Sequence, residues 1–421
     1  MSSKKRKSPP QESLTSYFEK SSKSSKKYGS QNKDSDSSST CLQQKIEIQW
    51  SITDSLYIAK YGKLKKTKKF IAFDLDGTLI KTKSGRVFSK DAADWTWWHP
   101  SVVPKLKALY QDNYSLVIFS NQNGIPRKPS AGHTFQMKIR AIFESLDLPI
   151  VLYAAILKDK FRKPLTGMWN SFLKDVNRSI DLSFIKYVGD AAGRPGDHNS
   201  TDLKFAENIG IKFETPEQFF LGHSFVPPNF ESFHPKNYLV RNSSSHPYHF
   251  KKSEHQEIVV LVGFPSSGKS TLAESQIVTQ GYERVNQDIL KTKSKCIKAA
   301  IEALKKEKSV VIGMYSIIST TYAISDNTNP TIESRKMWID IAQEFEIPIR
   351  CIHLQSSEEL ARHNNVFRYI HHNQKQLPEI AFNSFKSRFQ MPTVEEGFTN
   401  VEEVPFKCLK DYEDTWNYWY E

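Results

Sequence analysis

The sequence predicts an α/β protein with two folded domains, each built on a mainly parallel sheet, and three observations support this class. Short apolar runs at 70–73, 116–119 and 184–188 each end at a polar residue, with helical patterns between them. A further run at 257–262 leads directly into a glycine-rich loop. The length of 421 residues is enough for two or three domains that each bury their own core.

Residues 1–44 form a tail that we expect to be disordered, because it is rich in Ser, Lys, Gln and Asp and has few apolar side chains to bury. The basic run 4–7, Lys-Lys-Arg-Lys, predicts nuclear import and therefore a nuclear location. A solvated basic cluster without a transport role would give the same sequence.

The main apolar side chains of the tail gather between Gln11 and Phe18. Leu14 follows Gln11 by three residues, and Tyr17 and Phe18 follow in turn, which resembles a sliding-clamp-binding peptide. One helical turn would place these apolar side chains together as a plug for a hydrophobic pocket. A chance cluster in a low-complexity tail explains the spacing equally well.

Charge and cysteine content narrow the class of partner and the compartment. The formal charge of +13 favours a polyanionic partner such as nucleic acid, although a basic tail on an ordinary enzyme would also raise it. The four cysteines form no C-x-x-C pair, so we expect neither a disulfide framework nor a zinc site. The sequence has no signal peptide or membrane-length apolar run, which predicts a soluble, intracellular monomer without membrane contact.

The first block, residues 45–225, carries two acids at the end of its first parallel strand. Asp74 and Asp76 are two residues apart, so both side chains lie on one side of the sheet, and Gly77 allows a sharp turn. Two such carboxylates can bind Mg²⁺, and one can attack phosphorus while the other moves a proton. Two solvated acids at a surface turn are the alternative.

The rest of this block resembles the haloacid-dehalogenase (HAD) phosphatase superfamily, with the motif residues in the family order. The resemblance implies that Asp74 is the nucleophile and Asp76 the general acid and base. It also implies phosphate contacts from Ser120 and Asn121, and Mg²⁺ ligation by Asp74, Asp76 and Asp190. The further residues that match are Lys163, which would balance phosphoryl charge, and Asp202 as a late acidic position.

An aromatic cluster in the same block consists of Trp95, Trp97, Trp98 and His99. They could stack on a frayed nucleobase, or they could be buried as part of a cap over the site. Residues 226–254, with two adjacent prolines and little periodicity, are interpreted as a linker.

The second domain, residues 255–421, opens with a phosphate-binding loop of the form G-x-x-x-x-G-K-S between a strand and a helix. Its backbone amides would hold the phosphates of ATP, Lys269 would reach the β- and γ-phosphates, and Ser270 would ligate Mg²⁺. The predicted ATP-binding residues are Gly263, Phe264, Pro265, Ser266, Ser267, Gly268, Lys269, Ser270 and Thr271.

Polar residues further along this domain are candidates for transfer chemistry. Asp288 ends the next strand-like run and could accept the proton of an attacking hydroxyl, although a surface aspartate is as good an explanation. Arg362 and Arg368 have the pattern of a lid that supplies guanidinium groups to the transferring phosphoryl, or of a solvated helix face.

Taken together, these motifs resemble the polynucleotide kinase 3′-phosphatase family from about residue 45 to the end of the chain. The resemblance implies that the protein removes 3′-phosphates and phosphorylates 5′-hydroxyls at broken DNA ends, using Mg²⁺ and ATP. It also implies that Asp288 is the kinase base, that Asp326 contacts the acceptor end, and that Arg335 contacts substrate.

Two features depart from the family pattern. The animal members carry an N-terminal forkhead-associated domain, where this sequence has only its tail. Thirteen residues, 313–325, also stand between the strand run 309–312 and Asp326, which directly follows that strand in the family. Because codons for Gly-Met-Tyr can contain a GTATGT splice donor, we hypothesise that 313–325 is a translated, unspliced intron, with a genuine loop or extra strand as the alternative.

The sequence therefore predicts a bifunctional enzyme that prepares DNA ends for repair and ligation. An enzyme that heals RNA ends is the nearest alternative, and a repair scaffold with an inactive kinase half is another. The sequence does not determine the preferred break geometry, the choice between DNA and RNA, the weight of the two activities, or the orientation of the domains.

Overall fold

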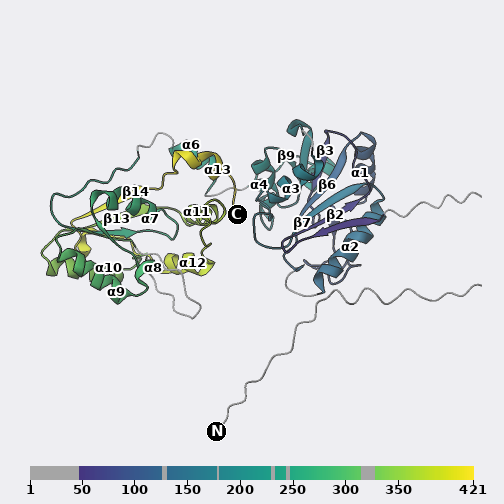
Figure 1. The fold of residues 1–421 in the computed structure, drawn as a ribbon. Coiled ribbons are helices and arrows are strands. Elements are labelled where there is room, and N and C mark those ends of the chain that lie inside the picture. The colour runs from purple at the N-terminus through teal and green to yellow at the C-terminus, as the bar shows by residue number, and fades with distance from the viewer. Residues whose placement is uncertain (1–46, 126–129, 178–179, 229–232, 243–246, 314–327) are drawn as a thin grey trace, which may run out of the picture. The chain divides into compact units, whose positions relative to one another are not determined.

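The computed structural model describes residues 47–125, 130–177, 180–228, 233–242, 247–313 and 328–421, without the side chains of Gln287 and Asp288. The predicted tail features and Asp326 lie outside these residues. The described chain contains a seven-stranded sheet and a five-stranded sheet, each in its own α/β domain, as Figure 1 shows.

The first domain is a mostly parallel sheet with the strand order β1-β2-β7-β6-β3-β8-β9. Strands β6, β3, β8 and β9 pair in parallel, as do β6 and β7, whereas β1 and β2 add an antiparallel edge. The strands are β1 (Ile48–Ile52), β2 (Leu56–Tyr61), β3 (Phe70–Phe73), β6 (Ser115–Asn121), β7 (Ile150–Ala155), β8 (Ile185–Val188) and β9 (Lys212–Glu214), with a separate hairpin of β4 (Ile80–Lys81) and β5 (Thr96–Trp97).

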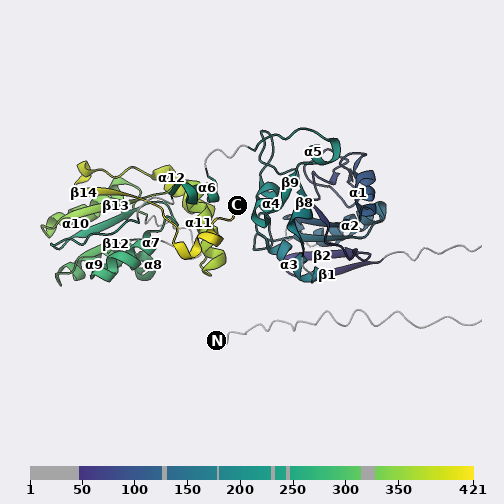
Figure 2. The ribbon, with the colours of Figure 1, turned by 90° about the horizontal axis from the view of Figure 1, so that it is seen from above.

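Helices cover both faces of this sheet, which explains why β3 and β7 are buried at every position. Helices α1 and α2 lie on one face of the sheet, and α3 and α4 lie on the other (Figure 2). Side chains of α1 and α2 belong to one core layer, and those of α3 and α4 belong to the opposite layer. The helices are α1 (Val102–Gln111), α2 (Ala131–Leu146), α3 (Gly167–Val176), α4 (Thr201–Ile209) and α5 (Pro216–Leu221), with a 3₁₀ turn at Leu182–Phe184.

The tryptophan cluster belongs to the core of the first domain. Trp95, Trp97 and Trp98 are partly buried and pack against the layer formed with α1 and α2. The ring of Trp98 lies 6.1 Å from the ring of Phe220, centroid to centroid. This placement supports burial over base stacking.

The second domain is a fully parallel sheet with the strand order β11-β12-β10-β13-β14. Helices α9 and α10 pack on one face, and α7 packs on the other. The strands are β10 (Ile258–Val262), β11 (Glu283–Val285), β12 (Val310–Ile312), β13 (Ile349–Gln355) and β14 (Asn400–Pro405).

The helices of the second domain follow its strands in the alternation that the sequence predicted. They are α7 (Lys269–Leu272), α8 (Gln287–Leu290), α9 (Lys293–Leu304), α10 (Ile332–Glu344), α11 (Glu358–His371), α12 (Glu379–Arg388) and α13 (Glu413–Trp416). Helix α7 continues through a π turn at Ala273–Ile277 and a 3₁₀ turn at Val278–Gln280, and further 3₁₀ turns occur at Val394–Glu396 and Lys410–Tyr412.

Part of the predicted linker packs on the second domain. It contains helix α6 (Pro235–Asn242), and the Tyr238 hydroxyl donates a hydrogen bond to the Phe406 carbonyl at 2.9 Å. Phe250 joins the core layer beneath α7. In the described part of the chain, no helix combines the length and the apolar character that a membrane crossing requires.

Candidate active sites

Three polar residues of the first site lie at the carboxyl ends of neighbouring parallel strands. Asp74 directly follows β3, Ser120 is the second-to-last residue of β6, and Asp190 follows β8 by two residues. Because β3 lies between β6 and β8, these ends meet at one edge of the sheet. The fold therefore brings these three residues together, as the sequence predicted.

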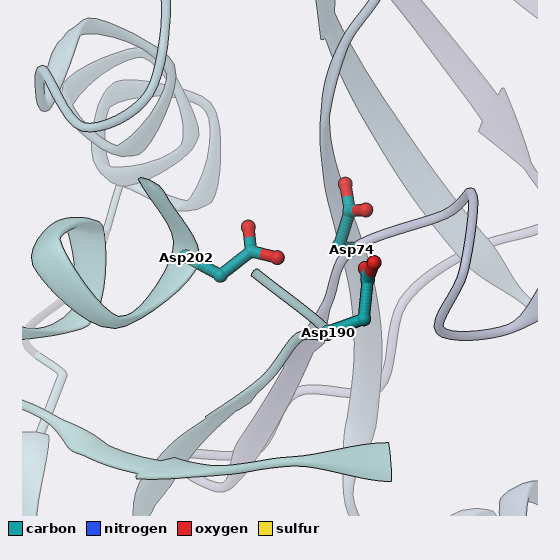
Figure 3. Close-up of side chains that lie close together, drawn as sticks. All are labelled: Asp74, Asp190 and Asp202. Carbon is teal, nitrogen blue, oxygen red and sulfur yellow. The ribbon is translucent and has the colours of Figure 1, made fainter. Parts of the chain in front are cut away.

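Three carboxyl groups converge at this edge, as Figure 3 shows. Carboxylate oxygens of Asp74, Asp190 and Asp202 all lie within 4.8 Å of one another. Asp202 comes from the first turn of α4 and is almost completely buried. The late acidic position suggested by the sequence is thus part of the site.

Lys163 is the cation of this cluster and is buried within it. Its Nζ donates to Asp74 Oδ1 at 2.7 Å, to Asp202 Oδ1 at 2.7 Å and to the Tyr187 hydroxyl at 2.8 Å. Tyr187 in turn donates to Asp202 Oδ1 at 3.0 Å, so the ammonium has fixed partners on several sides. Sequence reasoning assigned no role to Tyr187, because it lies inside strand β8 and not at its end.

Burial and crowding shift the protonation of these groups. Burial raises the pKa of Asp74 well above its usual range, and Asp202 and Asp190 add to this while Lys163 opposes it. Burial also raises the pKa of Asp190 to about 6, with Asp202 adding to the effect. Burial alone would discharge Lys163, but Asp202 and Asp74 outweigh it and raise the pKa of its ammonium.

The acid cluster fits a magnesium ion by its chemistry. Mg²⁺ prefers carboxylate oxygens, and among the described residues two buried carboxyl groups and the partly buried Asp190 gather around the single ammonium of Lys163, which leaves negative charge uncompensated. Asp190 is also held in place by Thr78, whose hydroxyl donates to Asp190 Oδ1 at 3.1 Å. The residues suited to hold the ion are Asp74, Asp190 and Asp202.

Two glycines allow the carboxyl groups to come this close. Gly77 has a φ of +82°, and a Cβ on it would lie 2.5 Å from Asp190 Oδ2. A Cβ on Gly189 would lie 2.5 Å from Asp202 Oδ2. Any larger residue at either position would push an acid out of the cluster.

The side chain of Asp76 does not lie where the sequence predicted. It lies outside the three-acid group, and its carboxylate accepts hydrogen bonds from Lys138 and Gln122. The sequence predicted that this carboxylate ligates the metal, but in the structure it lies beside the acid cluster. Lys138 was missed from the sequence, because a single lysine in a helix carries no local signal.

Asn121 positions the backbone of Lys163. Its Oδ1 accepts from the Lys163 amide at 2.9 Å, and its Nδ2 donates to the Lys163 carbonyl at 3.1 Å. These two bonds use one of the two N–H donors of the amide, so the predicted phosphate contact of Asn121 stays a prediction. Ser120 lies beside it, and its Oγ accepts from Gln122 Nε2 at 2.9 Å.

The second site is the loop between β10 and α7, where the sequence placed it. Gly263 and Gly268 have φ values of +152° and +100°, and a Cβ on Gly263 would lie 2.8 Å from the Leu354 carbonyl oxygen. The loop therefore depends on glycine for its path. Ser270 and Thr271 lie in the first turn of α7, whose amino end closes the loop.

Lys269 is folded back into this loop. Its Nζ donates to the carbonyls of Gly263 at 2.7 Å and Phe264 at 2.6 Å. Burial lowers the pKa of Lys269 to about 7, and Arg368 contributes to the shift. Among the described residues no carboxylate pairs with this buried ammonium, and a polyphosphate bound in the loop would supply an anionic partner.

Helix α11 lies over the loop and contributes Arg368. Arg368 Nη1 donates to Ser266 Oγ at 3.0 Å, and Asn364 Nδ2 donates to the Ser266 carbonyl at 3.2 Å. The indole of Trp416 donates to Asn364 Oδ1 at 2.7 Å, which fixes the amide that touches the loop. A lid position for Arg368 is consistent with these contacts.

The other two predicted arginines are engaged by carboxylates. Arg362 pairs with Glu358 at 2.8 Å and also with Glu379. Arg335 is fully buried, and its guanidinium donates to both oxygens of Glu396, at 2.7 and 2.6 Å. The predicted substrate contact of Arg335 is corrected: a guanidinium without exposed surface supports the domain from within.

Two predicted residues of the kinase site have no described side chain. Asp288 belongs to α8, directly after β11, and β11 ends at the same edge of the sheet as β10. Asp326 lies outside the described residues, and the nearest described residue that follows it is Thr328, which is buried. Their roles stay predictions.

Comparisons with known proteins match both halves of the chain. The family model for polynucleotide kinase 3 phosphatase matches residues 69–220, and that for an AAA domain matches residues 258–392. A bifunctional polynucleotide phosphatase/kinase of Schizosaccharomyces pombe is 97% identical over 421 residues, with all of both chains covered.

Two further relatives match a shorter part of the chain. A polynucleotide 3′-phosphatase of Saccharomyces cerevisiae is 32% identical over 206 residues, which covers 36% of this chain and 87% of that protein. Polynucleotide 3′-phosphatase ZDP of Arabidopsis thaliana is 35% identical over 188 residues, which covers 41% of this chain and 27% of that protein.

Proposed function

The chain belongs to the bifunctional polynucleotide phosphatase/kinase family, and we propose that it heals broken DNA ends by removing 3′-phosphates and phosphorylating 5′-hydroxyls. The observation that carries the phosphatase half is the buried Lys163, which bridges Asp74 and Asp202 at 2.7 Å at the carboxyl ends of the parallel strands. The complete glycine-rich loop with Lys269 carries the kinase half.

In the phosphatase reaction Asp74 is the nucleophile. A carboxylate oxygen of Asp74 bonds to phosphorus as the bond to the 3′-oxygen breaks, and the departing oxygen takes a proton from Asp76. Asp76 then removes a proton from the water that hydrolyses the aspartyl phosphate, which restores both acids. Lys163 neutralises charge on the phosphoryl group, and Mg²⁺ held by Asp74, Asp190 and Asp202 would supply further positive charge.

In the kinase reaction the γ-phosphoryl group of ATP passes to a 5′-hydroxyl. Asp288 accepts the hydroxyl proton, Lys269 holds the β- and γ-phosphates, and Ser270 supplies a ligand for Mg²⁺. Arg368, which lies over Ser266, is placed to contact the transferring group when ATP fills the loop. Because both reactions are expected to use Mg²⁺ and only the kinase uses ATP, a single buffer that contains both supports the two reactions.

DNA is the proposed polynucleotide, and RNA is the alternative that the test must separate. Matched DNA and RNA oligonucleotides with a 3′-phosphate, and a second pair with a 5′-hydroxyl, would be compared by kcat/KM. We expect DNA to be preferred in both reactions. Equal or higher values for RNA would favour an RNA-healing enzyme.

Whether the second domain is an active kinase depends on whether residues 313–325 are part of the native protein. Gly313, the first residue of the stretch, and Asn329, beyond its end, both lie beside Leu261: a Cβ on Gly313 would be 3.4 Å from Leu261 Cδ1, and Asn329 Nδ2 donates to the Leu261 carbonyl at 3.0 Å. The chain therefore returns to the same residue after the stretch, so a shorter connection is possible here, which supports the proposal that the stretch is a retained intron. Kinase assays with and without residues 313–325 would test it, and a native peptide spanning 318–322 would contradict it.

The tail supports two proposals on recruitment. The basic run 4–7 would direct nuclear import, and Leu14, Tyr17 and Phe18 would bind a sliding clamp. A sliding clamp used as bait should capture the wild-type protein, but not a variant in which these three residues are replaced by Ala. Unchanged capture by that variant would count against the interaction. A monomer is expected, which light scattering of the purified protein would check.

A further inference from the structure

Lys138 is a charged residue in the buried stripe of helix α2. The apolar members of that stripe include Phe135, Ile139 and Ile142, and Lys138 falls between them with an exposed fraction of 7%. An ammonium buried in this way is costly unless its donors are satisfied, and a methionine would fill the same space without that cost. The position therefore calls for an explanation beyond packing.

The ammonium of Lys138 holds one oxygen of Asp76. Lys138 Nζ lies 2.8 Å from Asp76 Oδ1, and Gln122 Nε2 lies 2.6 Å from Asp76 Oδ2. Gln122 also donates to Ser120 Oγ at 2.9 Å, so this second support is tied to strand β6. The Asp76 side chain is half exposed, and two donors from different elements fix the plane of its carboxyl group.

Lys138 is itself held from a second direction. Its Nζ donates to Ser89 Oγ at 3.2 Å, in the segment between β4 and β5. That segment is braced by the buried Asp94, which accepts from the Ser84 amide at 2.8 Å and the Lys90 amide at 3.0 Å. The support for Asp76 is thus preformed by the fold.

A general acid contributes only when its proton points at the departing oxygen, within about 2.6–3.2 Å. An ammonium can only donate, so Lys138 keeps Asp76 Oδ1 as an acceptor and leaves Oδ2 to carry the proton. Oδ2 accepts from Gln122 Nε2 through one lone pair, so a proton carried by Oδ2 stays free to point at the departing oxygen.

We propose that Lys138 is a positioning residue of the phosphatase, which orients Asp76 to protonate the 3′-oxygen that leaves phosphorus. The proposal rests on the proposed function of the first domain and adds a residue to it. The proton moves from Asp76 Oδ2 to the 3′-oxygen while the phosphorus–oxygen bond breaks and Asp74 bonds to phosphorus. Lys138 neither gains nor loses a proton in this step.

The test uses the dependence on the leaving group. A nucleoside 3′-oxygen needs a proton as it departs, whereas the phenolate of p-nitrophenyl phosphate departs without one. Lys138→Met removes the ammonium and keeps the bulk, Lys138→Arg keeps donors at the same place, and Arg140→Met on the exposed side of α2 is the matched control. Each full-length variant would be measured in single turnover with a 3′-phosphorylated oligonucleotide and with p-nitrophenyl phosphate. The readouts are formation of the 3′-hydroxyl oligonucleotide and of p-nitrophenolate, because both report departure of the leaving group and not the later hydrolysis of the aspartyl phosphate.

We expect Lys138→Met to form the 3′-hydroxyl oligonucleotide about 10- to 100-fold more slowly, a part of the usual contribution of a general acid. Its rate with p-nitrophenyl phosphate should stay within about threefold of wild type, since the leaving group needs no proton. Lys138→Arg should recover much of the oligonucleotide rate, and Arg140→Met should match wild type.

Equal losses on both substrates would overturn the proposal and make Lys138 a structural residue. Wild-type rates on both substrates in Lys138→Met would overturn it as well. Failure of the wild-type protein to release the 3′-phosphate would instead overturn the proposed function, and the proposal with it. The three results are distinguishable, because only the last one appears before any substitution is made.

Discussion

Replacing Arg335 by Met separates a structural role of this arginine from the substrate contact that its sequence context suggested. Arg335 has no exposed surface, and its guanidinium makes two hydrogen bonds to Glu396 and one each to the carbonyls of Asn329 and Gln390. Met would leave Glu396, with a side chain only 6% exposed, as a buried carboxylate without its partner.

The expected cost follows from that unpaired charge. Removing one member of a buried ion pair destabilises a protein by about 3–5 kcal/mol. A domain of this size loses about 2–4 °C in melting temperature per kcal/mol, so the kinase domain should melt roughly 6–20 °C earlier. Arg335→Met combined with Glu396→Leu should recover much of this, because the lone carboxylate is removed.

The assay is residual activity after brief heating at a series of temperatures, measured for kinase and phosphatase in the same sample. Arg335→Met should lower the midpoint for kinase loss and leave the phosphatase midpoint unchanged. A variant with a wild-type kinase midpoint and a raised KM for the 5′-hydroxyl oligonucleotide would refute the reasoning and restore the substrate contact.

Three further predictions concern the two sites. Asp74→Asn should abolish release of 3′-phosphate and leave 5′-phosphorylation intact, and loss of both in end-labelling assays would argue against separable sites. Chelation of Mg²⁺ by EDTA should stop both reactions, and Asp190→Asn should raise the Mg²⁺ concentration that restores the phosphatase, which a titration would show. The pKa of Lys269, lowered to about 7, makes this lysine mostly neutral at pH 8.5, and the phosphates of ATP should recharge it. ATP binding should therefore take up about one proton at pH 8.5 and none well below pH 7, measurable by calorimetry in buffers of different ionisation enthalpy. Equal uptake by Lys269→Met would contradict that assignment.

Residues at the ends of strands were the predictable part of both sites. Asp74, Ser120 and Asp190 each follow an apolar run, and parallel strands bring such positions to one edge of the sheet. The loop from Gly263 to Lys269 is equally local, because its glycines and the following helix are contiguous in sequence. For these residues the local sequence is enough to predict their positions in the two sites.

The residues that sequence reasoning missed or misplaced depend on tertiary contacts. Lys138 reaches Asp76 from a helix 62 residues away in sequence, and Tyr187 reaches Lys163 from the interior of a strand. Arg335 falls on the buried stripe of α10 with Trp338 and Ile339, and its buried partner Glu396 is 61 residues away in sequence. Partners at such separations leave no periodic or motif signal in a single sequence.

The central claim, that one chain prepares both sides of a DNA break, is tested most directly on a nicked duplex with a 3′-phosphate and a 5′-hydroxyl. The protein would be incubated with this duplex, ATP and Mg²⁺, and the two termini would be read separately. We predict conversion to a 3′-hydroxyl and a 5′-phosphate, with Asp74→Asn losing only the first change and Lys269→Ala only the second. Wild-type protein that leaves either terminus unchanged would contradict the claim.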